Sequence, residues 1–301
     1  MIRRFVGKVP NDSIEEGLIN LLANMTGENP SEIQLSEEVH ANLKQAQSKI
    51  LEIKKIITPF YENLKSQNNK ESNKKINELI DIGKFIYCLE KKSELEIIKC
   101  GEQPDFTVKY QGEFIGIEHT GIFDDKVVAE IETLKKIMGK CQDKLNNDRS
   151  DITGLFNIIV IPSKLKGQLP RKESEIIESI CNYIIAKHQN REIDKPDFIS
   201  DSIQLKHPIL ELAMGEDYWL EELTPEAIAN TILKKENKIN TYKSSNDLNK
   251  CWLLIVIDGA SSASSFNIKL ETLPIHLTPF DKIYIFDKFK ETIIKVEKTD
   301  G

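Results

Sequence analysis

The chain has 301 residues, of which 40% are hydrophobic and 30% charged, as in a soluble globular protein that buries its own core. Its formal net charge of −7 is unusual for a nucleic-acid binder, although binding depends on local surface charge and not on the total. No apolar run reaches the roughly 18 residues of a membrane span, so a cytoplasmic protein without a membrane partner is expected. The five cysteines lack the CxxC spacing that is typical of a structural zinc site.

The first part of the chain is predicted to be helical, because apolar residues recur at helical spacing over residues 12–66. One helix is expected over roughly 36–57, and Pro59 is expected to end or kink it. The polar run at 66–73 predicts a linker or loop. Residues 1–68 are therefore interpreted as a helical N-terminal extension, and residues 69–301 as the main domain.

The main domain is predicted to begin with a helix over about 74–92, followed by three strands at 95–100, 106–110 and 113–119. Glu78 precedes Ile82 by four residues and Phe85 by seven, which places it on or beside the buried face of the helix. Gln111-Gly112 between the last two strands is a tight-turn signal, so these strands are expected to form a hairpin.

The rest of the chain alternates predicted helices and strands. Helices are expected at 124–147, 172–189 and 225–242, and strands at 155–161, 251–257, 282–286 and 292–296, with irregular structure over 190–224. The all-apolar run at 251–257 is typical of a central strand buried on both faces. The predicted fold class is α/β.

Two carboxylates carry the strongest chemical signal. Asp105 follows Pro104 at the start of one hairpin strand, and Glu118 ends the other strand, so the turn would bring the two side chains opposite each other. Carboxylates and a backbone carbonyl are ligands that Mg²⁺ or Mn²⁺ prefers, and such an ion can activate water and stabilise a phosphate. Because strand alternation turns the His119 side chain away, its carbonyl is the expected third contact.

In this order of elements, residues 74–120 resemble the core of the PD-(D/E)XK nuclease superfamily. Pro104-Asp105 matches the PD of the motif, Glu118-His119-Thr120 stands where the family has (D/E)XK, and Glu78 occupies the place of an acidic residue on the first core helix. The resemblance implies a restriction-endonuclease-like core, with a central mixed sheet flanked by helices and an insertion at about 121–224. It also implies a catalytic role for Glu78.

The sequence departs from the motif at Thr120, where the family has a lysine that positions water and stabilises charge. Some members supply this lysine from a nearby helix. Lys235 and Lys238 share one face of the predicted helix before the central strand, by i, i+3 spacing, and are the preferred replacements. Lysines on the helix at 124–147 are the alternative source.

The resemblance thus implies a Mg²⁺-dependent nuclease that hydrolyses phosphodiester bonds, with DNA preferred over RNA as the expected substrate. Thr120 and the net acidity keep open an inactive nucleic-acid-binding or protein-interaction module on the same fold, such as a subunit of a bacterial defence or mobile-element system. A homodimer or a complex with a partner subunit is left open.

Overall fold

The computed structural model describes residues 17–20, 23, 29–90, 94–165, 167–169, 171–217, 221–237, 239, 248, 250–259, 262–268 and 278–296. The chain divides into two compact units, Met1–Cys100 and Gly101–Gly301. Among the described residues, no helix has both the length and the apolar character needed to cross a membrane.

The first unit is mainly helical. It contains a short 3-10 helix, η2 (Pro30–Glu32), the helices α2 (Glu37–Gln67) and α3 (Lys70–Cys88), and the strand β1 (Leu95–Cys100). Asn69 caps α3 through a reciprocal capping box with Ser72. The predicted boundary at residue 68 lies between α2 and α3.

Helix α2 continues through Pro59, so the prediction that this proline ends the helix was wrong. The polar run at 66–73 contains the end of α2, a connection of two residues and the start of α3. Beside the proline, the Thr58 hydroxyl donates to the Lys54 carbonyl at 2.7 Å, and the buried Ile53 and Ile57 anchor the helix in the turns before this point. Tertiary packing therefore outweighs the local effect of the proline.

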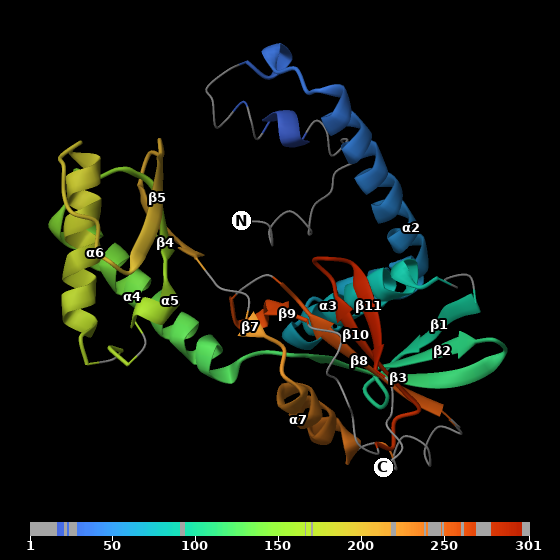
Figure 1. Ribbon diagram of the computed structural model, residues 1–301. Helices are drawn as coiled ribbons and strands as arrows, with labels where there is room; N and C mark the ends of the chain where they lie inside the picture. Colours follow the sequence, from blue (N-terminus) through green and yellow to red (C-terminus); the bar gives the residue numbers. More distant parts are fainter. Residues whose placement is uncertain are drawn as a thin grey trace. The chain divides into compact units, whose positions relative to one another are not determined.

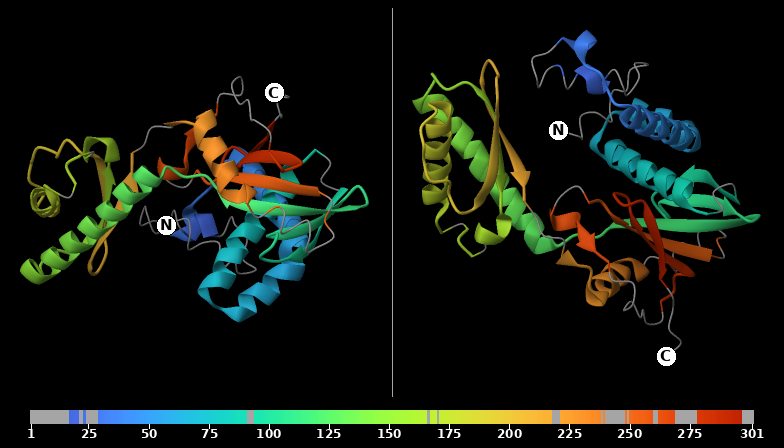
Figure 2. Two further views of the ribbon diagram at one scale, coloured as in Figure 1. Left: turned by 90° about the horizontal axis from the view of Figure 1, so that it is seen from below. Right: turned by 45° about the horizontal axis from the view of Figure 1, so that its top comes forward.

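Helices α2 and α3 lie side by side (Figure 2), and Gly83 of α3 packs closely against Ile57 and Ile53 of α2. A Cβ added at Gly83 would lie 2.5 Å from Cγ2 of Ile57. We expect Gly83→Ala to lower the free energy of unfolding by about 1–3 kcal/mol through overpacking, measured by urea unfolding. Gly139→Ala is the control, because nothing lies within 4 Å of its added Cβ, and it should leave stability unchanged or raise it. Equal effects of the two substitutions would contradict the close packing.

The second unit contains a mixed sheet of the strands β2 (Phe106–Tyr110), β3 (Glu113–Gly121), β8 (Lys250–Ile257), β10 (Lys282–Asp287) and β11 (Thr292–Val296), adjacent in that order (Figure 1). The three central strands β3, β8 and β10 are parallel, and the outer pairs are antiparallel. Seven of the eight residues of β8 are buried, which confirms the predicted central strand. The α/β class is also confirmed.

The predicted hairpin is confirmed. Strands β2 and β3 pair antiparallel, with Tyr110 opposite Glu113, and Gln111 and Gly112 both have positive φ, at 52° and 85°. This left-handed turn matches the twist of the two strands and fixes their register.

Helix α7 (Pro225–Glu236) covers one face of this sheet. Its buried Ile228 and Ile232 share a hydrophobic core with alternate residues of β8, including Leu253 and Ile255. The odd-numbered residues of β8 therefore face α7. Because β3 pairs with β8 in parallel, the residues of β3 that are in register with them face the helix as well. Two short strands, β7 (Glu221–Glu222) and β9 (Phe266–Asn267), form a separate parallel pair, and η4 (Ser262–Ser264) is a short 3-10 helix.

The segment between β3 and β8 builds a second sheet with its own core. It contains the helices α4 (Asp125–Asp148), α5 (Pro162–Leu165) and α6 (Glu173–His188), and the strands β4 (Gly154–Val160), β5 (Ile199–Leu205) and β6 (Leu210–Glu216). The strand order is β5-β4-β6. Strands β5 and β6 correct the prediction of irregular structure over 190–224. Both are edge strands with one buried residue each, and the short apolar stretch around 209–212 lies within or beside β6.

Candidate functional site

The hairpin brings Asp105 and Glu118 together at one end of β2. Phe106 pairs with Ile117, and the antiparallel register continues by one residue to place Asp105 opposite Glu118. The backbone N–H of His119 donates to Oδ2 of Asp105 at 2.9 Å. The Asp105 carboxylate therefore lies directly beside the backbone of residues 118 and 119.

Asp105 is held by the loop that precedes β2. The Gly101 N–H donates to the Asp105 carbonyl at 2.9 Å, which closes the loop. Pro104 packs over Gly116, since a Cβ added there would lie 2.9 Å from Cγ of the proline ring. Pro104 and Gly116 therefore pack closely against each other. This contact positions Asp105 directly before the first residue of β2.

Glu118 faces helix α7. Its register partner in β8 is Leu253, and in-register residues of parallel strands point to the same face of a sheet. Leu253 packs in the core that α7 covers. Glu118 is only 2% exposed and Asp105 only 8%, so both carboxylates lie where unpaired negative charge is costly.

The cation beside Glu118 is supplied by Lys235 on α7. Its ammonium lies 2.8 Å from Oε1 of Glu118 and 3.2 Å from the His119 carbonyl oxygen. Lys235 follows Ile232 by three residues and Ile228 by seven, so all three side chains share the face of α7 that covers the sheet. The side chain of Lys235 is 22% exposed, so it lies at the border between the core and the surface.

The structure thus brings together Asp105, Glu118, the His119 backbone and Lys235, and it includes the lysine chosen from helical spacing. Lys238, the other chosen lysine, lies outside the described residues. Thr120 stands two residues beyond Glu118 on the same face of β3, and its hydroxyl donates to the Gly121 carbonyl at 3.4 Å.

Glu78 lies on α3 in the first unit and is 7% exposed. Its carboxylate is 2.6 Å from the ammonium of Lys75 and 3.6 Å from that of Lys74. The prediction that Glu78 lies at the buried face of its helix is confirmed. Its catalytic role stays a prediction from the resemblance.

The donor set fits a hard divalent cation. Within the described residues, no group of three or more His, Cys, Asp and Glu side chains is arranged to hold a metal ion. Mg²⁺ does not require such a group, because it is commonly bound by one or two carboxylates with water and substrate phosphate. Oε1 of Glu118 and the His119 carbonyl already share one cation, the Lys235 ammonium, so both oxygens face a position that accepts positive charge.

Comparison of the chain with models of known protein families, with curated proteins and with solved structures gives no match.

Proposed function

We propose that the chain is a Mg²⁺-dependent phosphodiesterase that cleaves nucleic acid, with DNA preferred over RNA. The observation that carries the proposal is the contact of Lys235 with Glu118 beside Asp105. Two carboxylates of one hairpin meet a lysine from a distant helix at a buried strand end, as the nuclease resemblance would require. A purely structural ion pair would not need the second carboxylate beside it.

Each residue has a distinct role in this proposal. Asp105, Glu118 and the His119 carbonyl would hold Mg²⁺, which when bound lowers the pKa of a water molecule and neutralises phosphate charge. Lys235 donates hydrogen bonds toward the attacking water or a phosphate oxygen and stabilises the negative charge that develops there. Its ammonium replaces the motif lysine, because the position of the charge in space matters more than its position in the sequence.

The alternative is a non-catalytic binding module on the same fold. The Lys235–Glu118 ion pair is the observation that favours this alternative, since an ammonium already neutralises one of the two carboxylates. In such a module the pair would be structural, and neither Asp105 nor Glu118 would be needed for any metal-dependent reaction.

A plasmid-nicking assay separates the two functions. We expect the wild type to nick supercoiled DNA in Mg²⁺ or Mn²⁺ and not in EDTA, and Asp105→Ala to lose this activity by at least about a hundredfold. Glu113→Ala is the matched control, because this carboxylate is exposed at the other end of β3. A labelled RNA of the same sequence tests the preference for DNA. If neither substrate is cleaved in a metal-dependent, Asp105-dependent way, the nuclease proposal fails.

A further inference from the structure

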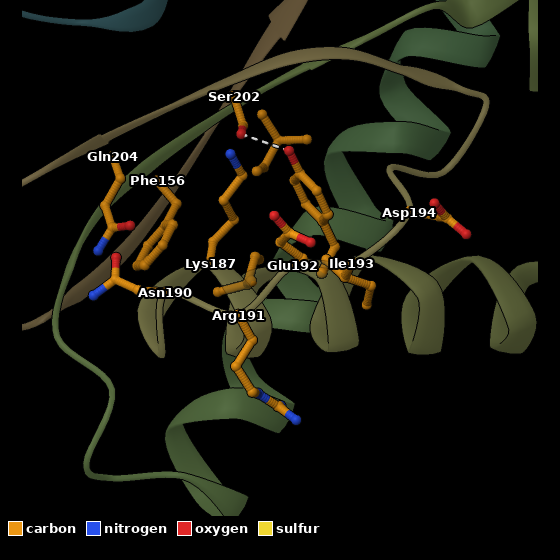
Figure 3. Close-up of a pocket in the computed structure, with 12 residues that line it drawn as sticks. Phe156, Lys187, Asn190, Arg191, Glu192, Ile193, Asp194, Ser202 and Gln204 are labelled. Atoms are coloured by element: carbon orange, nitrogen blue, oxygen red, sulfur yellow. Dashed lines mark hydrogen bonds between the residues drawn. The ribbon is translucent and has the colours of Figure 1, made fainter.

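The segment between β3 and β8 contains a pocket of about 930 Å³, formed by α6, the residues that follow it and the face of β4 and β5 (Figure 3). This volume lies within the range of pockets that hold small molecules. The pocket was not predicted from the sequence, because seven of its twelve lining residues lie in 190–204, a range expected to be irregular. The proposed nuclease function does not use any of its residues.

One end of the pocket offers a cation and two hydroxyls. The Tyr183 and Ser202 hydroxyls hydrogen-bond to each other at 2.8 Å, and the Lys187 ammonium lies 5.7 Å from the centre of the Tyr183 ring. Figure 3 shows the Lys187 side chain extending toward Ser202. An ammonium beside hydroxyl groups is suited to bind one phosphate group.

The other end of the pocket offers two carboxamides. Gln204 is the cross-strand partner of Phe156, and Asn190 follows the end of α6, so the two amides come to the pocket from different elements. Both side chains belong to exposed residues. Each carboxamide presents a donor and an acceptor together, which is the pattern that reads the edge of a nucleobase.

The charges of the rim limit the ligand. The positive charges of Lys187 and Arg191 are balanced by the negative charges of Glu192 and Asp194, so the pocket is not suited to bind several linked phosphate groups. In Figure 3, Arg191 points away from the interior. A single phosphate joined to a base with mixed donors and acceptors satisfies both ends of the pocket.

We propose that this pocket binds one nucleotide, with its base at Asn190 and Gln204 and its phosphate near Lys187. The inference rests on the proposed function, because a nuclease meets nucleotides in its substrate. The nucleotide is either an unpaired unit of a nucleic-acid strand or a free mononucleotide, and the two sources share the same chemistry.

Fluorescence anisotropy of the full chain in EDTA tests the proposal without cleavage. The probes are labelled homo-oligomers of deoxyadenylate, deoxythymidylate and deoxycytidylate and an abasic oligomer of equal length, with the free mononucleotides as competitors. We expect at least one base-containing ligand to bind about tenfold more tightly than the abasic oligomer. Displacement by a mononucleotide identifies the free nucleotide as the source, and binding of oligomers alone identifies the strand.

Variants at exposed positions link this preference to the pocket. Asn190→Ala and Gln204→Ala should remove most of the preference for bases, whereas Lys187→Ala should weaken binding of every probe. Gln189→Ala and Lys206→Ala are matched controls outside the lining and should bind as the wild type does.

Equal binding of base-containing and abasic probes, unchanged binding by the Asn190 and Gln204 variants, or no binding of any probe would overturn the inference. Plasmid nicking is measured separately, so the two failures are distinguishable. A chain that nicks DNA without a preference for bases loses only the pocket proposal. A chain that binds bases in this pocket without nicking DNA loses only the nuclease proposal.

Discussion

Replacing Lys235 with methionine is expected to reduce metal-dependent cleavage by about a hundredfold to a thousandfold, the usual cost of losing one group that stabilises the charge of a transition state. Methionine keeps much of the length of the lysine stem and removes the ammonium. Metal binding should survive, because Lys235 contacts Oε1 of Glu118 and the His119 carbonyl as a cation and would compete with Mg²⁺ for both oxygens. We expect Mn²⁺ to bind Lys235→Met at least as tightly as the wild type, measured by titration calorimetry.

Lys234→Met provides the matched control for this experiment. Lys234 is the preceding residue on α7, its side chain is 72% exposed, and its ammonium lies 3.7 Å from Asp125, outside the site. Its replacement should leave both cleavage and metal affinity unchanged. If Lys235→Met cleaves as the wild type does, another residue replaces the motif lysine. If it loses Mn²⁺ affinity as well as cleavage, Lys235 holds the site together and has no separate role in the reaction.

Replacing Glu118 with glutamine is expected to remove stabilisation by metal. A ligand that binds only the folded state at a hundred times its dissociation constant stabilises a protein by about 2.7 kcal/mol. We therefore expect Mn²⁺ to raise the melting temperature of the wild type and to leave that of Glu118→Gln almost unchanged. Glutamine has nearly the same shape as glutamate but lacks the charge that attracts both Lys235 and a divalent ion.

Glu113→Gln tests whether the effect belongs to the site. Glu113 begins the same strand, its side chain is 57% exposed, and it pairs with Lys250. Its replacement should leave the metal-induced shift in melting temperature intact. A shift that persists in Glu118→Gln would show that the ion binds elsewhere in the chain.

The central part of the site follows from local sequence patterns. Gln111-Gly112 between two short strands predicted the hairpin, and the hairpin register then placed Asp105 opposite Glu118. Helical spacing placed Lys235 on the same face of its helix as Ile228 and Ile232, whereas its meeting with Glu118, 117 residues away in the chain, was implied by the nuclease resemblance. The hairpin and the face of the helix depend on local contacts, which sequence periodicity describes well.

Other features depend on contacts between distant residues, so sequence periodicity alone could not predict them. Helix α2 passes Pro59 because its buried side chains pack against a neighbour, and the edge strand β5 has a single buried residue. In β6, by contrast, Leu210, Leu212 and Met214 alternate toward the core, so this strand could have been predicted from its sequence. The pocket on α6 needs side chains from three segments that meet only after this small sheet has formed. Spacing also could not separate Lys235 from Lys238, because both satisfy the same helical face.

The most direct test of the proposed metal site is a crystal structure of the wild-type chain soaked in Mn²⁺, with the ion located by anomalous scattering. If Asp105 and Glu118 hold a divalent ion together, an anomalous peak is expected at about 2.1 Å from carboxylate oxygens of both residues. We also expect the Lys235 ammonium to move off Oε1 of Glu118 while staying next to the site. A well-ordered site with no peak between the two carboxylates, and with Lys235 still bound to Glu118, would contradict the proposed metal site.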